Sequence, residues 1–199
     1  MKYQMNERVY HFAYSTLIRS AGLPGDVRKA LKSEYRSIME RAKDIGQKNT
    51  LLGSYTLCAF FIAFVRTSGK SPEECYGILE EGVRGSRLFR IAFGDADSYL
   101  SERNMAKRRI WEKETHQRRY ENDWVVDVLG PSDDYDLGYD YTECGALKLC
   151  RDEGCPELAG YLCRLDFLLS SQIGLELRRT GTLADGASRC DFRFSRRKE

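Results

Sequence analysis

Five of the seven cysteines lie in the last third of the chain, where acidic, threonine and arginine side chains also gather. A cysteine attacks as a thiolate, so a reactive one needs a cation or a helix N-terminus nearby to lower its pKa. Cys144 directly precedes an expected helix, whereas Cys163 and Cys190 adjoin polar residues at element ends or on a mixed face. These three are the candidate nucleophiles. Cys58 and Cys75 are expected to pack as small apolar residues.

Two aspartates in the same region are candidate general bases. Cys163 and Asp166 are three residues apart in an expected helix, so their side chains share one face of it. A carboxylate at the boundary between helix and sheet can have a raised pKa, which suits a general base at neutral pH. Asp191 directly follows Cys190 and is the second candidate base. The alternative for either carboxylate is an ordinary solvated side chain.

The common catalytic motifs are missing from the sequence. It contains no phosphate-binding GxxxxGK[ST], no GxGxxG, no HExxH and no GxSxG. Only His11 and His116 could serve a Ser-His-Asp or Cys-His site, and an ordinary position on a helix explains both. The cysteines form no CxxC pair, so we predict no metal site and no cofactor.

Composition and charge narrow the class of protein. The 199 residues are 42% apolar and 31% charged, which excludes a disordered or collagen-like chain. We expect one domain over residues 1–199, helical in 1–121 and sheet-containing in 122–199. The net charge of +2 gives no argument for nucleic acid or an anionic membrane as partner.

Export and membrane signals are also lacking. The longest apolar run, residues 57–65, is too short to span a bilayer, so we predict no membrane association. The N-terminus shows no signal-peptide pattern. We therefore expect a cytoplasmic protein whose cysteines are reduced.

The first half of the chain has apolar residues at helical spacing. We expect helices at 9–18, at 26–45 with Asp26 as N-cap, at 50–65, from Ser71 to Leu88 or Ile91, and at 96–119. Residues 50–65 are apolar on nearly all sides, which predicts a helix at the centre of a bundle. Ser71 and Glu74 form a capping box around Pro72.

The helix expected at 96–119 is rich in arginine and lysine. Such a helix can bind phosphates or a partner, but a solvated face with Met105, Ile110 and Trp111 turned inward explains the pattern as well. Because charge is the only support, a nucleic-acid partner is not favoured.

The second half alternates strands and helix. We expect strands at 124–129 and 135–144, a helical stretch at 145–171 broken near 154–156, and a final hairpin of 175–183 with 189–195. Pairing Ala184 with Arg189 gathers the apolar hairpin residues on one face: Leu175, Leu177, Leu183, Cys190, Phe192 and Phe194. The order of elements predicts an α+β fold, an N-terminal helical bundle packed on a small antiparallel sheet formed by the C-terminal third.

Several segments of the C-terminal third resemble one enzyme family. They are Tyr141-Thr142-Glu143-Cys144, Cys163-Arg164-Leu165-Asp166, the run from Arg179 to Gly186 with its acidic-Gly turn, and Cys190-Asp191-Phe192-Arg193-Phe194. Together they resemble the L-2-amino-thiazoline-4-carboxylic acid hydrolases over about residues 135–195. The resemblance implies hydrolysis of a cyclic thiazoline amino acid to N-carbamoyl-cysteine.

That reaction requires an attacking group, a base, hydrogen-bond donors and a cation for the substrate carboxylate. Water or one of the three candidate thiols would attack, with Asp166 or Asp191 as base. Threonines would donate hydrogen bonds and arginines would anchor the carboxylate. The candidates for these binding roles are Arg178, Arg179, Thr180, Thr182 and Arg193.

A second class of function fits the same residues. A pocket between helices and sheet can bind a small molecule without turnover, and clustered thiols suit redox or metal sensing. The missing catalytic motifs favour this alternative. Either interpretation makes a small molecule the main partner, and the sequence leaves a homo-oligomer open.

Overall fold

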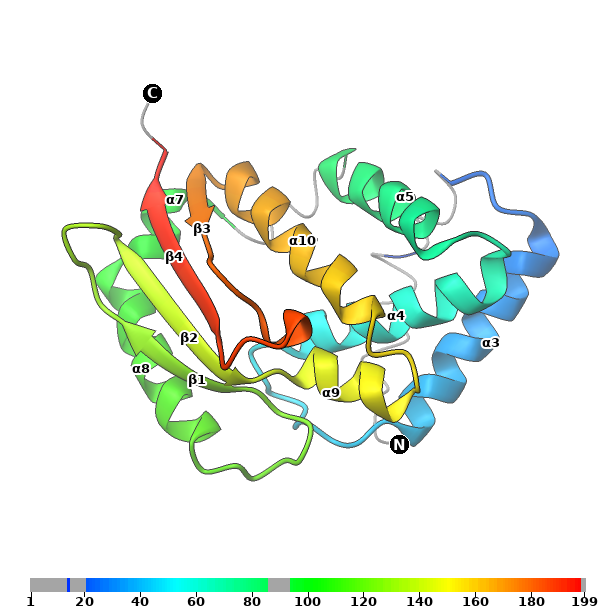
Figure 1. Ribbon diagram of the computed structural model, residues 1–199, viewed down its shortest axis with the longest axis horizontal. Helices are drawn as coiled ribbons and strands as arrows, with labels where there is room; N and C mark the ends of the chain where they lie inside the picture. The colour runs from blue at the N-terminus through cyan, green and yellow to red at the C-terminus, as the bar shows by residue number, and fades with distance from the viewer. Residues whose placement is uncertain (1–13, 15–20, 86–93, 198–199) are drawn as a thin grey trace.

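The computed structural model describes residues 14, 21–85 and 94–197 (Figure 1). In this part of the chain, seven α-helices, mostly N-terminal, precede or flank a four-stranded antiparallel sheet, which confirms the α+β fold. The elements are α3 (Gly25–Arg41), α4 (Leu52–Ser68), α5 (Pro72–Gly85), α7 (Ala96–Leu100), α8 (Glu102–Thr115), β1 (Val125–Leu129), β2 (Leu137–Glu143), α9 (Gly145–Asp152), α10 (Leu158–Gln172), β3 (Leu175–Arg178), the 3₁₀ turn η2 (Leu183–Asp185) and β4 (Cys190–Arg196). The helix expected at 9–18 and the helix end expected at Leu88 or Ile91 lie outside the described residues.

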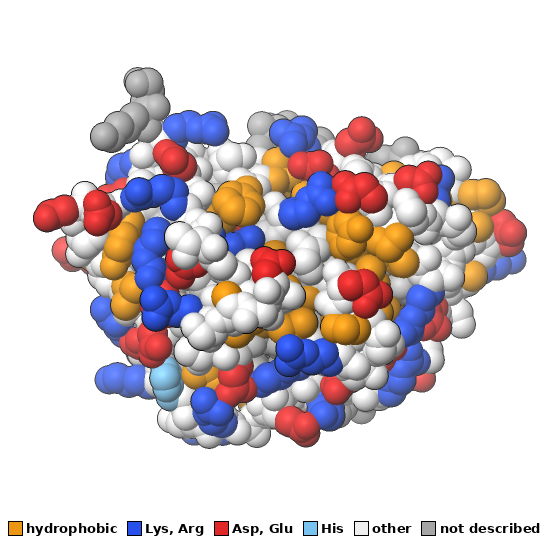
Figure 2. Space-filling model, in the orientation of Figure 1, with side chains coloured by type: hydrophobic (Ala, Val, Ile, Leu, Met, Phe, Trp, Pro, Cys, Tyr) orange, Lys and Arg blue, Asp and Glu red, His pale blue; other side chains and the backbone are white. Residues whose placement is uncertain are grey.

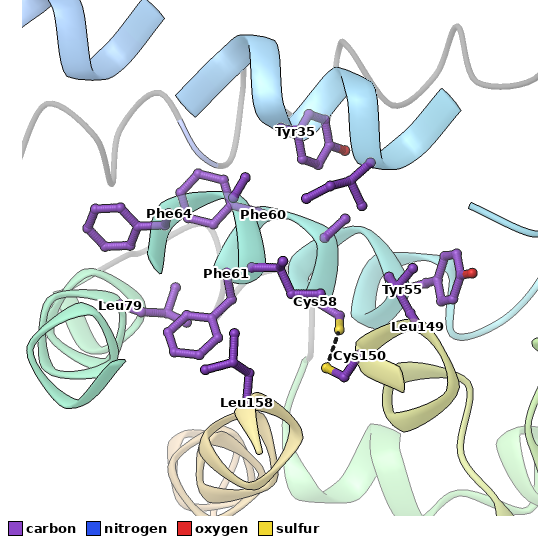
Figure 3. Packing of buried hydrophobic residues seen from close by; sticks show 14 of the residues in the cluster. Tyr35, Tyr55, Cys58, Phe60, Phe61, Phe64, Leu79, Leu149, Cys150 and Leu158 are labelled. Atoms are coloured by element: carbon purple, nitrogen blue, oxygen red, sulfur yellow. Dashed lines mark hydrogen bonds between the residues drawn. The ribbon is translucent and has the colours of Figure 1, made fainter. Parts of the chain in front are cut away.

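Helix α4 is the centre of the helical part, as its apolar sequence predicts. It contacts α3, α5, α9 and α10, and Phe61 and Ile62 on it are fully buried. Figure 3 shows α4 side chains pointing to several neighbours, with Phe61 beside Leu79 of α5 and Cys58 beside Cys150 of α9. Burying each such phenyl or aliphatic group contributes about 1.5–3 kcal/mol. None of the described helices combines the length and hydrophobicity needed to cross a bilayer.

Of the two helix caps predicted from the sequence, one is present and one is wrong. The capping box before α5 is present: the Ser71 amide donates to the Glu74 carboxylate at 2.8 Å, and the Glu74 amide donates to Ser71 Oγ at 3.3 Å. The prediction of Asp26 as an N-cap is wrong, because Pro24 occupies that position and Asp26 lies in the first turn of α3. There its carboxylate still faces the positive end of the helix dipole.

The helix expected at 96–119 is interrupted. Ser101 has an extended backbone that ends α7, and its Oγ accepts from the Asn104 amide and so caps α8. Trp111 faces inward as predicted, with 9% of its surface exposed, but Ile110 is 61% exposed and its predicted burial is wrong. Neighbouring residues on a helix point about 100° apart, so packing Trp111 on the sheet turns Ile110 to solvent.

The sheet has the strand order β1-β2-β4-β3, with every neighbouring pair antiparallel. Leu177 lies opposite Phe194, two residues away from the predicted hairpin register. The difference arises because the residues after Arg178 leave the sheet and form a loop containing η2. A shift of two residues leaves the paired side chains on their predicted face, which is confirmed for Leu175, Leu177, Cys190, Phe192 and Phe194. The strand predicted to run to residue 183 is wrong beyond Arg178, and Leu183 lies in η2 outside the sheet.

The two faces of the sheet have different environments. The apolar face packs against α7, α8 and the end of α10, forming a core cluster that includes Trp111, Val126 and Tyr139. Figure 1 shows α8 lying behind the sheet, with the other face uncovered. The uncovered face carries polar side chains such as Asp140 and Arg193.

Side chains of α8 also occupy the free edge of β1. The Val128 amide donates to Glu112 Oε1 at 2.7 Å, and Arg109 donates to the Val128 carbonyl. The Val126 amide donates to Thr115 Oγ1 at 3.4 Å. These contacts satisfy backbone groups that would otherwise leave an open strand edge.

Substituting Glu112→Ala removes the acceptor of the Val128 amide, and we expect the free energy of unfolding to fall by about 1–2 kcal/mol. Glu114→Ala is the matched control, because Glu114 is exposed on the same helix and should change stability by less than about 0.5 kcal/mol. Urea denaturation of both variants measures the difference. Equal stability of the two variants would show that the Glu112 contact contributes nothing.

Candidate active site

A pocket of about 150 Å³ lies where α4, α9 and α10 meet η2 and the near ends of β2 and β4. These elements converge beside the sheet in Figure 1. Most of the lining is apolar, including Leu57, Trp124 and Phe192. On the molecular face shown in Figure 2, hydrophobic side chains interrupt the charged surface over α10, where Phe167 is 44% exposed.

Four of the predicted site residues line this pocket together. Cys144 is the N-cap of α9, Cys163 and Asp166 lie one turn apart on α10, and Cys190 begins β4. They come from three segments that are separated by up to 46 positions in the sequence (144 to 190). The fold thus brings three thiols and one carboxyl group to a single, mostly apolar space.

Asp166 is held in place by Arg179. The guanidinium donates from Nη1 to Asp166 Oδ2 at 2.9 Å and from Nη2 to the Cys163 carbonyl at 3.0 Å. Burial raises the pKa of Asp166 to about 6, and the charge and hydrogen bond of Arg179 oppose this rise. A carboxyl group with this pKa is mainly ionised at neutral pH and close to the value that suits a general base.

Arg179 itself is nearly buried, with 6% of its side chain exposed. Its guanidinium lies over the rings of Phe167 and Phe192, 5.0 Å and 4.9 Å from their centroids. Cation–π contacts of this kind hold the planar group while its N–H donors reach a carboxylate. Arg179 is therefore placed to orient Asp166, and it is not itself part of the described pocket lining.

The pocket thiols are not activated. Burial raises the pKa of Cys144 to about 11, although the Ala146 and Leu147 amides at the start of α9 act in the opposite direction. Burial also raises the pKa values of Cys163 and Cys190. The expectation that the helix N-terminus lowers the Cys144 pKa is corrected, because desolvation of the thiolate outweighs the helix.

The low reactivity that follows from these raised thiol pKa values is testable by alkylation. At about pH 7, we expect iodoacetamide to modify Cys144, Cys163 and Cys190 at least about tenfold more slowly in the folded protein than after unfolding in urea. Mass spectrometry of the digested protein follows each site separately. Modification of one folded-state thiol faster than in the unfolded chain would reveal an activated thiolate and contradict the assignment.

Asp191, the second residue of β4, holds the loop that contains Thr180 and Thr182 beside the pocket. Asp191 Oδ1 accepts from the Thr180 and Gly181 amides, each at 2.9 Å, and Oδ2 accepts from the Thr180 hydroxyl at 2.6 Å. Burial favours a raised pKa for Asp191, but these hydrogen bonds outweigh it and the pKa is lowered. Thr182 caps η2 by accepting from the Asp185 amide. These groups hold the loop and are absent from the described pocket lining.

The remaining two predicted anchors lie on the other side of the sheet. Strand alternation turns Cys190 and Phe192 to the pocket and Arg193 to the uncovered face, where Arg193 pairs with Asp140 at 2.8 Å. Arg178 is exposed and donates to the Asp134 carbonyl. The structure therefore does not bring Arg178 or Arg193 to the pocket.

Four polar or aromatic lining residues were not among the predicted site residues: Ser54, Trp124, Tyr141 and Phe192. Tyr141 lies in a segment that carries the family resemblance, and strand alternation predicts its face, but neither signal indicates a pocket. Ser54 and Trp124 lie far from the other candidates in sequence. Within the described ranges, no group of three or more His, Cys, Asp or Glu side chains is placed to hold a metal ion.

One of three comparisons with known proteins gives a match. A model of the L-2-amino-thiazoline-4-carboxylic acid hydrolases matches residues 54–194, a range that contains every described residue of the pocket lining except Leu51. No curated protein and no solved structure gives a significant match. Because the matched range covers well over half of the chain, the protein belongs to the L-2-amino-thiazoline-4-carboxylic acid hydrolase family.

Proposed function

We propose that the protein opens the ring of L-2-amino-thiazoline-4-carboxylate by adding water to the amidine carbon, the ring carbon bonded to sulfur and two nitrogens. Water forms a carbon–oxygen bond and gives one proton to Asp166. The tetrahedral intermediate then breaks its carbon–sulfur bond while its hydroxyl becomes the product carbonyl. Of the two protons of the added water, one passes to the departing sulfur and the other to the ring nitrogen. The product is N-carbamoyl-cysteine, which contains the atoms of the substrate plus one water.

The observation that carries this proposal is the placement of Asp166. Its carboxyl group lines an apolar pocket, has a pKa of about 6 and is fixed by a buried arginine. These are the properties of a general base that works near neutral pH. Family membership supports hydrolysis as the class of reaction.

The raised thiol pKa values favour water over a cysteine as the attacking group. A thiol that stays protonated at neutral pH is a poor nucleophile. We assign Cys144, Cys163 and Cys190 to the wall around the substrate sulfur. We assign Arg179 as a positioning residue and Asp191, Thr180 and Thr182 to the loop that shapes this wall.

Release of a thiol tests the proposal directly. The purified protein is incubated with the thiazoline at about pH 7, and new thiol is measured with a chromogenic disulfide reagent while mass spectrometry identifies the product. We expect thiol in proportion to substrate consumed, and N-carbamoyl-cysteine as its source. Consumption without thiol would mean that a carbon–nitrogen bond breaks instead, and no consumption at any pH would refute ring hydrolysis.

A sensor without turnover is the second candidate, and one contact favours it. Cys58 and Cys150 are buried with their sulfur atoms 3.5 Å apart, so thiols gather outside the pocket as well. Tight binding of the thiazoline with no product over many hours would favour the sensor.

All seven cysteines are free, which supports our further proposal of a cytoplasmic location.

A further inference from the structure

The pocket carries one charge. Among its described lining residues, Asp166 is the single side chain that is ionised at neutral pH, and the other polar groups are thiols, hydroxyls and the indole N–H of Trp124. A charge in a largely apolar space acts strongly on any charged group that enters, because little water screens it. Arg179 offsets this charge from outside the lining through Oδ2, so Asp166 favours a ligand that brings N–H donors, above all cationic ones, to its other oxygen.

The geometry of Asp166 leaves an acceptor available for a ligand. Arg179 engages Oδ2, and no hydrogen bond from a described residue reaches Oδ1. The side chain is 34% exposed, so ligand atoms have access to it. A carboxylate has about four lone-pair sites, so Asp166 can accept from an N–H group of a ligand and from water at the same time.

We infer that this site recognises its substrate through a cationic amidine group, and that a ring carboxylate is dispensable for binding. The inference rests on the proposed function, in which this pocket holds the ring. A 2-aminothiazoline ring is a basic amidine whose N–H groups point the way a carboxylate accepts them. Its protonated form pairs with Asp166 and is also more open to attack by water.

The substrate carboxylate lies elsewhere in this arrangement. An anionic group inside the pocket would lie against the like charge of Asp166 and lose its hydration shell. None of the described lining residues is a cation that could compensate for the lost hydration. The carboxylate therefore projects through the opening into solvent. Ser54 is an exposed lining residue in the first turn of α4, so it marks the solvent side of the pocket.

Calorimetric titration with three probes tests the inference. They are 2-amino-2-thiazoline, its 4-carboxylate, and thiazolidine-4-carboxylate, which keeps the carboxylate but lacks the amidine. We expect the Kd of 2-amino-2-thiazoline to be no more than about threefold that of its 4-carboxylate, and thiazolidine-4-carboxylate to bind at least about tenfold more weakly. A larger advantage for the 4-carboxylate over 2-amino-2-thiazoline would overturn the inference.

Two variants give independent readouts. Asp166→Asn should weaken binding of 2-amino-2-thiazoline at least about tenfold. Ser54→Arg changes an exposed residue and adds a cation at the opening, so it should shift the affinity ratio at least about tenfold toward the 4-carboxylate. If Asp166→Asn fails to fold, the Ser54→Arg variant alone tests the inference. An unchanged ratio of the two affinities in Ser54→Arg would count against the inference.

Turnover measured in the same samples separates the two proposals. If 2-amino-2-thiazoline binds through Asp166 but neither ring opens, the proposed hydrolysis is refuted while the ligand class stands. If the 4-carboxylate is hydrolysed and 2-amino-2-thiazoline neither binds nor reacts, the hydrolysis stands and recognition through the amidine is refuted.

Discussion

Asp166→Asn is expected to lower kcat for thiazoline opening by about 10²–10⁴-fold, the usual contribution of a general base. The amide keeps the size of the side chain but cannot accept a proton from water. It also removes the charge that Arg179 neutralises, so the guanidinium loses its ionic partner. Thiol release under saturating substrate measures kcat, and circular dichroism checks that the variant is folded.

Asp133→Asn is the matched control for this substitution. Asp133 is an exposed aspartate between β1 and β2, outside the pocket lining, and its conversion to asparagine should leave kcat within about twofold. Retention of more than a tenth of the activity by Asp166→Asn would exclude Asp166 as the base. The cysteines would then need to be tested in turn.

Gly145→Ala should be the most damaging single-methyl change near the site. A Cβ at Gly145 would overlap the Asn122 carbonyl and lie 2.6 Å from the Trp124 ring. Gly145 begins α9 directly after Cys144, and Trp124 lines the pocket. The chain must move at the start of α9, so we expect a loss of about 3 kcal/mol in the free energy of unfolding, together with weaker substrate binding.

Gly160→Ala supplies the comparison. Gly160 lies inside α10, and a Cβ there meets no atom within 4 Å. Replacing a helical glycine with alanine in open space should stabilise the protein by about 0.5–1 kcal/mol. Thermal and urea denaturation of the two variants should therefore give changes of opposite sign. If Gly145→Ala is as stable as the unsubstituted protein, the packing at the start of α9 is looser than described.

Features that depend on short-range pattern were predictable from the sequence. Residues close together in the sequence are enough to predict three such features: the all-round apolar α4, the capping box at Ser71 and the alternating faces of β2. The break at Ser101 was missed, although serine is a common N-cap, because the helical pattern of apolar residues continues across it. Periodicity alone does not show where a helix is cut.

The site was predictable only in part. Residue type and local spacing single out Cys144, Cys163, Cys190 and Asp166 as candidates, and these residues do share the pocket. The predicted hairpin register places Asp191 on the face opposite Cys190, so strand alternation is a usable signal against a shared site. Cys190 and Asp191 are adjacent in the sequence, and both have side chains that can do chemistry, so both were candidates although they lie on opposite faces of the strand.

Arg178 and Arg179 show why the other site residues could not be predicted without the folded structure. Arg178 and Arg179 are adjacent, yet Arg178 ends β3 on its exposed side while Arg179 turns inward to Asp166. Which of the two reaches the site depends on where the strand ends, and tertiary packing of the following loop decides that. The same holds for Ser54, which lines the pocket because α4 packs beside α9.

The central claim, that Asp166 acts as the base in its ionised form, is tested most directly by the pH dependence of kcat/KM for thiol release. The profile is measured from about pH 4.5 to about pH 9, and the ionisation of the free substrate is titrated separately and divided out. Because the base must be unprotonated, we predict a plateau above neutrality and a fall toward acid with an apparent pKa of about 6. Activity that instead rises only above about pH 8, as a thiol ionises, would contradict the account.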